Sequence, residues 1–373
     1  MSTTTANKAH LPLPRGVRES VPLAPLTTLG VGGRARFFAH VRDAAQLGLL
    51  LAWARERRLP TLLLGGGSNV VVADSGFAGL ALQFADSAID EQVRDGQVIW
   101  RVGAGAHWDS VVARAVEMRL AGLECLSGIP GNVGAAPLQN IGAYGQELAE
   151  CVRAVHVVER ASGENKVLSA DACGFGYRWS RFKGEWRERY VVTAVELALR
   201  AQGRPTVRYP QLQNALVTNE PTLAEVRRTV MSIRRRKSML CAPDDPNRRS
   251  VGSFFVNPIV DAVTLERVRA SLDAERARAM PCFPQAQGRF KLSAAWLIEA
   301  AGFAKGHQDG RVGLSTRHCL ALVNRGGASA SDIVRLASKV RERVWAQFGV
   351  ALQPEPQLIG FSACEVGALT GAA

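Results

Sequence analysis

The residues best suited to chemistry near the start of the chain form a glycine turn, LGGGSNVVVAD, at residues 64–74. Gly65, Gly66 and Gly67 can present successive backbone N–H groups, because glycine accepts positive φ and lets a phosphate approach the main chain. The β-branched residues 70–72 favour a strand rather than a helix after the turn. The pattern therefore disfavours a Rossmann fold, whose glycine turn opens a helix. It leaves two interpretations, an anion-binding nest or a plain hairpin turn.

A second glycine-rich stretch, residues 126–147, combines five glycines and two prolines with few charges. Surface loops are normally polar, so an apolar loop of this kind indicates backbone packed against a flat ligand or another domain. An ordinary buried crossover loop is the alternative interpretation. Four basic residues at 234–237 could meet an anion. They are equally explained by a helix that ends there, because cations at a helix C-terminus are favoured by the macrodipole.

The composition is that of a globular protein with two or three domains, since 373 residues exceed one ordinary core. Hydrophobic residues make up 47% and charged residues 21%, which argues against extensive disorder. No apolar stretch is long enough to span a bilayer, and the first twenty residues lack the apolar centre of a secretory signal. The seven cysteines are scattered singly, which favours a reducing cytosol and predicts no zinc or other metal site.

The formal net charge of +13 raises the question of a polyanionic partner. Basic residues are spread along the chain, as at 55–58, 227–237 and 247–249, and no nucleic-acid-binding motif lies among them. We therefore interpret each cluster as a solvated surface. A nucleic-acid-binding protein is the alternative, and its affinity would fall steeply with rising salt.

The elements expected to carry these residues alternate between helix and strand, which predicts an α+β fold. Asp43 can cap a helix that ends before Pro60, and Asp109 can cap another over 109–121. Thr222 and Glu225 form a capping-box pattern at the start of a third helix. Further expectations are strands at 152–158 and 190–199, helices near 291–302 and at 331–348, a loose leader at 1–23 and a frayed tail at 361–373.

Eight separated segments together resemble the UDP-N-acetylenolpyruvoylglucosamine reductases, flavoenzymes that complete UDP-N-acetylmuramic acid in peptidoglycan synthesis. They occur in the order of that family and span about residues 24–360. Tyr209 in RYPQL and the undeleted last third are similar to the longer of two family subtypes. The segments are TTLGVGG (27–33), LGGGSNVVVAD (64–74), GLECLSGIPGNVGAAPLQNIGAYG (122–145), FGYR (175–178), RRRKSM (234–239), GSFFVNP (252–258), KLSAAWLIEAAG (291–302) and EPQLIG (355–360).

The resemblance implies an FAD-binding domain of the vanillyl-alcohol-oxidase type, an α+β fold in two subdomains at 24–86 and 87–241. It further implies a separate α+β substrate-binding domain at 242–349, with residues 350–360 returning to join the second subdomain. FAD would be held non-covalently, with its pyrophosphate in the first glycine turn and its flavin beside the second glycine loop. The positions that match the cofactor-binding residues of the family are Gly65, Gly66, Gly67, Ser68, Asn69, Gly131, Gly134, Ala135 and Ala136.

The implied reaction is the NADPH-dependent reduction of UDP-N-acetylglucosamine enolpyruvate to UDP-N-acetylmuramate. A hydride from flavin N5 to C3 leaves negative charge at C2 and on the carboxylate, so the site needs a cation and a proton donor. Arg178 matches the arginine that stabilises the enolate, Glu355 an acid or hydrogen-bonding partner, and Ser253 the proton donor to C2. The positions that match the substrate-binding residues are Tyr177, Tyr209, Arg234, Lys237, Asn257, Phe283, Lys305 and His318.

Three positions depart from the family pattern. Leu29 stands where phenylalanine is common, Phe283 where the longer subtype has a substrate-binding tyrosine, and Gln357 where an arginine can follow the glutamate. The hydroxyl missing at Phe283 and the cation missing at Gln357 affect the expected contacts with the diphosphate of the substrate, not the redox chemistry. The resemblance further implies a cytoplasmic monomer without a nucleic-acid or membrane partner.

An oxidase or dehydrogenase of the same flavin fold, acting on an alcohol or sugar, is the alternative enzyme. Such relatives often tether the flavin through a histidine near the first glycine turn. Residues 59–79 contain no histidine, which favours the reductase.

Overall fold

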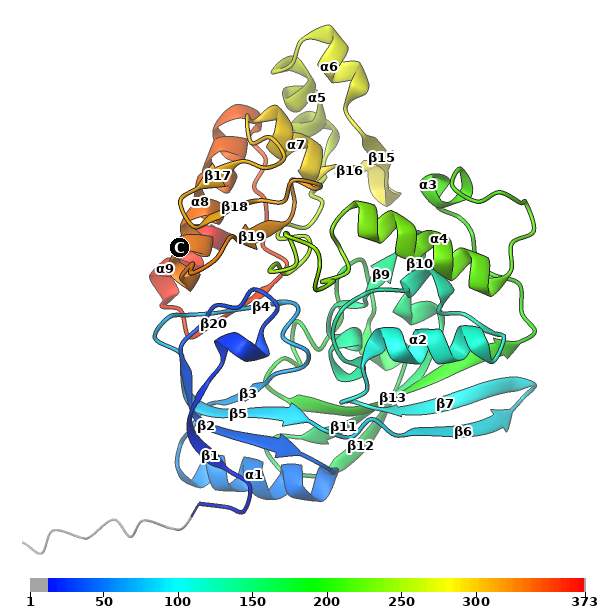
Figure 1. Cartoon of the computed structure of the whole chain (residues 1–373), viewed down its shortest axis with the longest axis vertical. Helices are drawn as coiled ribbons and strands as arrows, with labels where there is room; N and C mark the ends of the chain where they lie inside the picture. The colour runs from blue at the N-terminus through cyan, green and yellow to red at the C-terminus, as the bar shows by residue number, and fades with distance from the viewer. Residues whose placement is uncertain (1–12, 372–373) are drawn as a thin grey trace, which may run out of the picture.

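A four-stranded sheet with helix α1 on its outer face forms the N-terminal part of the chain in a computed structural model, which describes residues 13–371 (Figure 1). Asp43 caps α1 through a 2.7 Å bond from the Gln46 N–H, as predicted. The helix buries one apolar face, including Leu47 and Trp53, against the sheet. The elements are β1 (Arg18–Pro22), β2 (Arg34–Val41), α1 (Ala44–Glu56), β3 (Thr61–Leu63) and β5 (Phe77–Phe84), in the sheet order β1-β2-β5-β3.

An antiparallel sheet forms the second layer, beside the first (Figure 1). Its central strand β13 begins at Tyr190, pairs with β11 and β7, and is buried along most of its length. The strands expected at 152–158 and 190–199 are therefore confirmed. The members are β12 (Asn165–Ser169), β11 (Val152–Glu159), β13 (Tyr190–Ala201), β7 (Gln97–Gly103) and β6 (Ile89–Arg94) in that order, with β8 (Leu120–Ala121) also on β13.

Helix α2 (Trp108–Glu117) covers this sheet, and its bounds correct the prediction of a helix over 109–121. Its N-cap is His107, because the Asp109 carboxylate is engaged elsewhere. Asp109 accepts the Gly128 N–H at 2.6 Å and binds the Arg227 guanidinium through two bonds of 2.6 and 2.9 Å. The Asp109 carboxylate therefore does not cap α2, because it forms a bidentate ion pair with an arginine of a distant helix.

The second glycine stretch lies between β8 and β11 and folds largely as short 3₁₀ turns. Helix α4 (Leu223–Arg236) comes later in the chain. The predicted capping box is confirmed, since Thr222 accepts the Glu225 N–H and the Glu225 carboxylate accepts the Thr222 N–H. The short elements here are η2 (Glu124–Leu126), η3 (Val133–Gln139), β9 (Gly142–Ala143), β10 (Gln146–Glu147), η4 (Leu148–Glu150), η5 (Asp171–Cys173) and α3 (Pro210–Gln213).

Two small antiparallel sheets and five helices pack around an apolar core in the last third of the chain. Phe254, Phe255 and Phe348 are fully buried in this core. Helix α8 begins at Ala330, one residue before the prediction, and ends at Gly349 with φ +65° as expected. The elements are β14 (Ile259–Val260), α5 (Ala262–Ala270), α6 (Ala274–Ala279), β15 (Cys282–Pro284), β16 (Phe290–Leu292), α7 (Ala294–Ala300), β17 (Gln308–Asp309), β18 (Val312–Leu314), β19 (Leu322–Asn324), α8 (Ala330–Phe348) and α9 (Ala363–Thr370).

Both ends of the described chain are more ordered than predicted. Of the expected leader at 1–23, residues 1–12 lie outside the described residues, but residues 18–22 form β1 on β2. The expected tail at 361–373 forms α9, which has a capping box at Ser362 and buries Leu369. Both expectations were wrong for the described residues, because pairing and packing on distant elements outweigh weak local signals. No helix within 13–371 combines the length and hydropathy needed to cross a bilayer.

The chain returns to its beginning through strand β20 (Gln357–Ile359), which pairs in parallel with β4 (Val70–Val72) directly after the first glycine turn. We propose the domain division 24–86, 87–241 and 242–349, which is supported by the separate sheets of the three parts. The return segment pairs with β4 of the first part, while the Glu355 carboxylate accepts a bond from Gln139 of the second. In this division it therefore bridges both FAD-binding parts.

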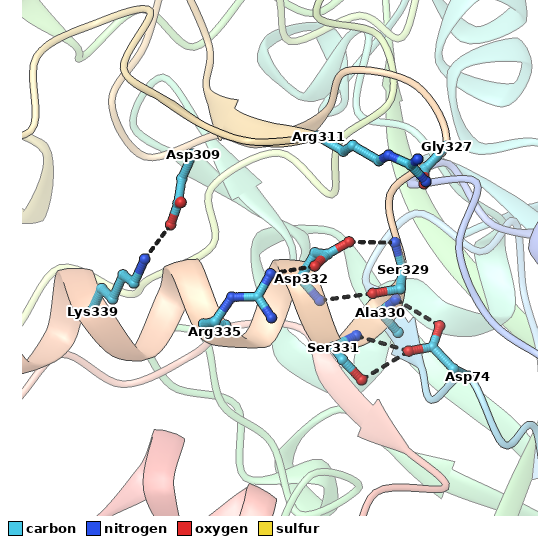
Figure 2. Close-up of polar contacts among 10 residues, drawn as sticks. All are labelled: Asp74, Asp309, Arg311, Gly327, Ser329, Ala330, Ser331, Asp332, Arg335 and Lys339. Atoms are coloured by element: carbon cyan, nitrogen blue, oxygen red, sulfur yellow. Dashed lines mark hydrogen bonds and ion pairs between the residues drawn. The ribbon is translucent and has the colours of Figure 1, made fainter.

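Asp74, two residues after β4, ties the first part of the chain to the N-terminus of α8 (Figure 2). Its carboxylate accepts the Ala330 N–H at 2.7 Å, the Ser331 N–H at 3.0 Å and the Ser331 hydroxyl at 2.8 Å. These donors belong to the first turn of a helix, where N–H groups lack intrahelical acceptors. The contact thus caps α8 from a residue about 256 positions earlier in the chain.

Replacing Asp74 with alanine should lower the free energy of unfolding by about 1–2 kcal/mol, the usual scale for losing a helix N-cap. The reason is that two N–H groups and one hydroxyl lose their shared acceptor. Urea unfolding followed by circular dichroism measures the loss. The Asp74→Asn variant, which keeps one acceptor oxygen, should lose less, and equal stability of all three proteins would contradict the capping role.

Candidate functional site

The two glycine loops meet backbone to backbone, which explains why small residues occupy them. A Cβ added to Gly66 would lie 2.8 Å from the Cα of Gly131, and one added to Gly67 would lie 2.0 Å from the Leu26 carbonyl oxygen. Gly67 and Gly131 also have positive φ values of +64° and +113°. The loops can therefore form this contact only without side chains at these positions.

The first glycine turn has the hydrogen-bond pattern of an anion-binding nest. Three of its carbonyl groups accept hydrogen bonds: Gly65 from Gln83, Gly67 from the Thr28 N–H and Asn69 from the Gln357 N–H, all at 2.9–3.0 Å. Within residues 13–371, the backbone N–H groups of 65–69 donate to no other group. No helix follows the turn, as predicted, because β4 begins at Val70. Successive free N–H groups of this kind suit a phosphate.

A cavity of about 220 Å³ opens between these loops and the return segment. Its lining brings together many of the residues predicted from the sequence. Those in the lining are Gly65, Gly66, Gly67, Ser68, Asn69, Gly131, Ala135, Ala136, Arg178, Arg234, Ser253 and Glu355.

A second cavity, of about 410 Å³, lies next to the first. The predicted residue Gly134 lines this one, and an added Cβ there would lie 2.6 Å from the Ala104 Cβ. The two cavities share lining residues, so they lie directly beside each other along the glycine loops. The shared residues are Leu63, Gly65, Asn132, Ala135, Leu138 and Gln357.

Replacing Gly66 with alanine should weaken flavin binding by at least tenfold, because its Cβ would collide with Gly131 and part the two loops. Flavin content after purification and titration of the apoprotein by flavin fluorescence measure the effect. Gly48→Ala is the matched control, since a Cβ on that helix glycine meets nothing within 4 Å. A Gly66→Ala protein with full flavin content would contradict the close approach.

A carboxylic acid and a guanidinium cation, both largely shielded from solvent, lie together at the wall of the first cavity. Glu355 Oε1 lies 3.6 Å from Arg178 Nε and accepts a 3.1 Å bond from Gln139 Nε2. Arg178 is held by a 2.7 Å bond from Nη2 to the Gly142 carbonyl oxygen. Its backbone has φ +52°, a conformation that a non-glycine residue adopts at a cost and that is concentrated at functional sites.

Burial and charge act on this pair in opposite directions. Burial raises the pKa of Glu355, while Arg178 and Lys183 lower it in part. Lys183, which donates a 3.4 Å bond to the Arg178 carbonyl oxygen, has its own pKa lowered by burial. The carboxyl thus keeps its proton at a higher pH than a free glutamate, which suits a group that donates a proton or a hydrogen bond.

Ser253 is brought to the same cavity by backbone pairing between its segment and the return segment. The Glu355 N–H donates to the Phe254 carbonyl oxygen at 2.8 Å, and Phe255 forms a bridge with Pro354. The chain turns at Gly252, which has φ +72°. Because of this pairing, Ser253 and Glu355 lie on neighbouring segments at one cavity, although they are far apart in the sequence.

Of the residues predicted to bind the substrate, only Arg234 lines the first cavity. Arg234 donates to the Gly128 and Met239 carbonyl oxygens at 3.1 and 2.8 Å. Tyr177 packs under Lys291, whose Nζ lies 4.7 Å from the ring centroid. Asn257 accepts the Ala294 N–H at 2.9 Å and so caps α7. Tyr209 is 40% exposed and contacts Tyr144 edge to face.

A group of basic residues lies at the edge of the site. Burial, with help from Lys237 and Lys305, lowers the pKa of His318 to about 4, so the imidazole is neutral at pH 7. Lys237 donates a 2.7 Å bond to Gln211, and Lys305 lies 3.4 Å from Glu299. Phe283 on β15 is 49% exposed and does not line either cavity.

Several residues of the site were missed from the sequence. Gln139 and Lys183 contact the Glu355–Arg178 pair, and Asn132 lines both cavities. Asn69, a predicted residue, donates to Gln139 at 2.9 Å and so completes a polar chain to Glu355. In the sequence, Asn132 and Gln139 could have been noticed as polar side chains in an otherwise apolar glycine loop. Lys183 could have been noticed as a lysine five residues after Arg178.

Comparison with known proteins gives matches along nearly the whole chain. Family models match residues 35–169 as an FAD binding domain and residues 244–359 as the C-terminal domain of UDP-N-acetylenolpyruvoylglucosamine reductase. A protein of that name from Thermobifida fusca is 48% identical over 351 residues, which are 91% of this chain and 97% of that protein. Its namesake from Nocardia farcinica is 46% identical, covering 92% and 90%. The crystal structure of UDP-N-acetylenolpyruvylglucosamine reductase from Thermus caldophilus covers 92% of this chain and 99% of its own, with TM-score 0.61 and 28% identity.

Proposed function

Because the chain belongs to the UDP-N-acetylenolpyruvoylglucosamine reductase family, we propose that it reduces UDP-N-acetylglucosamine enolpyruvate to UDP-N-acetylmuramate in peptidoglycan precursor synthesis. The enzyme is a flavoprotein oxidoreductase that uses FAD and NADPH. The observation that carries the proposal is the buried Glu355–Arg178 pair, which faces Ser253 across a cavity next to the glycine nest. The predicted α+β class is confirmed by the fold and by the FAD binding domain at 35–169.

The residues present fit FAD. The free N–H groups of 65–69 suit its pyrophosphate, and the close contact of Gly66 with Gly131 forms a cradle that a Cβ would fill. Ala135 and Ala136 present small side chains to the first cavity, where a flat ring can pack. When bound, FAD supplies the hydride for reduction of the enolpyruvyl double bond, after reloading by NADPH.

The side chains at the cavity supply what the reduction needs besides the hydride. Hydride addition to C3 leaves negative charge at C2 and on the substrate carboxylate. Arg178 provides a fixed guanidinium that binds and stabilises this charge. Ser253 donates the proton to C2, and the protonated form of Glu355 stabilises the intermediate from the opposite side.

The nucleotide end of the substrate would extend from the cavity toward the basic edge of the site. Arg234, Lys237 and Lys305 provide cations for the diphosphate, and the neutral His318 can accept or donate a hydrogen bond beside them. Tyr177 and Asn257 would contact the part of the substrate nearest the reacting carbons, with Tyr209 at the mouth. Phe283, which is exposed on β15, would contribute only an apolar contact to the substrate.

We place this reaction in the cytoplasm and assign it to a monomer. The seven cysteines, all within the described residues, are free thiols, as expected in a reducing compartment. The residues proposed for catalysis, Arg178, Ser253 and Glu355, line one cavity within a single copy of the chain, which is compatible with a monomer.

The test is NADPH oxidation by the purified yellow protein with and without UDP-N-acetylglucosamine enolpyruvate, followed by mass analysis of the product. Oxidation that requires this substrate and adds two hydrogens to it is the expected result. Bound FAD without such turnover would move the function to an oxidase of the same fold. A protein that binds no flavin would contradict the assignment of the glycine nest.

A further inference from the structure

The second cavity has the composition of a site for a flat, largely apolar group. Its walls are formed by the strand β3, the start of β13 and the end of β20, with aromatic side chains at Phe77, Phe84 and Phe182. It adjoins the first cavity, with which it shares lining residues at the glycine turn. An elongated ligand whose anionic middle lies in the nest would therefore extend one end into each cavity.

Arg160 is one of two arginines in the lining of this cavity, which also contains Arg187 and Glu188. Its side chain is only 16% exposed, and burial lowers its pKa. Its Nη1 donates to the Thr61 hydroxyl at 2.5 Å and lies 3.8 Å from the carboxylate of Glu188, whose side chain is 80% exposed. The guanidinium is thus only partly compensated by the protein.

The Nε–H group of Arg160 is buried and has no hydrogen-bond partner among residues 13–371. An unsatisfied buried donor costs free energy, so native structures satisfy nearly all such groups. Among the described residues that line the two cavities, only Arg160 has a buried side-chain nitrogen or oxygen without a hydrogen-bond partner. The donor therefore points to a ligand acceptor in the second cavity.

We propose that Arg160 binds the adenosine half of FAD in the second cavity, with its Nε–H donating to a ring nitrogen or a ribose oxygen. The inference rests on the proposed function, which places the flavin beside Glu355, Arg178 and Ser253 in the first cavity and the pyrophosphate at the nest. Only the adenosine then lies on the far side of the nest. Adenosine suits this cavity because it combines a flat ring for the aromatic wall with neutral hydrogen-bond acceptors.

The experiment compares flavins with and without adenosine. Apoprotein is titrated with FAD and with FMN, and flavin fluorescence reports the two dissociation constants. In Arg160→Ala the affinity for FAD should fall about 10- to 100-fold, the scale of a lost hydrogen bond from a charged donor, while the affinity for FMN should change less than twofold. ADP, which carries adenosine without flavin, should compete with FAD and should do so more weakly in the variant.

Matched variants separate this role from a general loss of structure. Arg160→Gln keeps most of the length of the side chain but not the charge, and should show the same selective loss of FAD affinity. Arg189→Ala removes a nearby arginine that pairs with Glu159 outside the cavity lining, and should leave both affinities unchanged. Thermal melting without flavin checks that each protein folds.

Two results would overturn the inference. Equal FAD affinity in wild type, Arg160→Ala and Arg160→Gln would show that Arg160 does not contact the cofactor. An equal fall for FAD and FMN would place its effect at the shared phosphate or flavin instead. A wild-type protein that binds neither flavin would contradict the proposed function itself, which distinguishes the two failures.

Discussion

Replacing Ser253 with alanine should abolish product formation while NADPH still reduces the flavin at the wild-type rate. The hydroxyl is assigned as the proton donor to C2, and its loss removes a step that comes after hydride delivery. General acids of this kind contribute about 10²- to 10⁴-fold, so turnover should fall by about that factor. Stopped-flow absorbance of the flavin and mass analysis of the product measure the two steps separately.

Two variants serve as controls for this result. Ser253→Thr keeps a hydroxyl at the cavity and should recover part of the activity. Ser271→Ala removes a hydroxyl that bonds only within the C-terminal turn of α5, and should have wild-type turnover. If NADPH-driven flavin reduction fell as much as product formation in Ser253→Ala, the role assigned to this serine would be wrong.

The second large effect is expected at Glu355. Glu355→Gln keeps the size of the side chain and can still accept the bond from Gln139, but it can neither ionise nor donate an acidic proton. We expect the rate of product formation to fall about 10²- to 10⁴-fold, with smaller changes in substrate affinity. Single-turnover oxidation of the reduced flavin by the substrate measures this step directly.

The pH dependence gives an independent readout. Burial raises the pKa of Glu355, so the protonated form persists to higher pH and is lost only as pH rises through that raised value. The wild-type rate should therefore decline on the alkaline side, and the limb that Glu355 causes should be absent from Glu355→Gln. Glu266→Gln, which alters a surface pair with Arg269, should keep the wild-type profile. A Glu355→Gln rate equal to wild type would exclude the carboxyl from the chemistry.

The parts of the fold that could be predicted are those set by local sequence. Asp43 and the Thr222–Glu225 pair cap their helices because their acceptors and donors lie three residues apart. The glycine turn at 65–67 could likewise be recognised, since three glycines followed by valines favour a turn before a strand. The resemblance then located Arg178, Ser253 and Glu355, which the structure gathers at one cavity.

The remaining features depend on partners far away in the sequence. Asp109 reads locally as a helix cap, but Arg227 captures its carboxylate from 118 residues away. Strand β1 and helix α9 have weak local signals and are ordered by pairing with β2 and packing near α8. Lys183 and Gln139 acquire their place only because the return segment brings Glu355 to them. Such contacts are properties of the tertiary structure rather than of a window of residues.

The return of the chain through β20 has a consequence for the order in which the enzyme is made. Asn69 of the glycine turn and Glu355 are separated by 286 positions, yet they meet in one site. During synthesis from the N-terminus, the first glycine turn and β4 emerge long before their partners β20 and Glu355. A nascent chain that stops before residue 355 has the glycine nest but lacks the acid and the strand that close the cavity. Completion of the active site is therefore coupled to the synthesis of almost the whole protein, and truncated products cannot carry out the reaction.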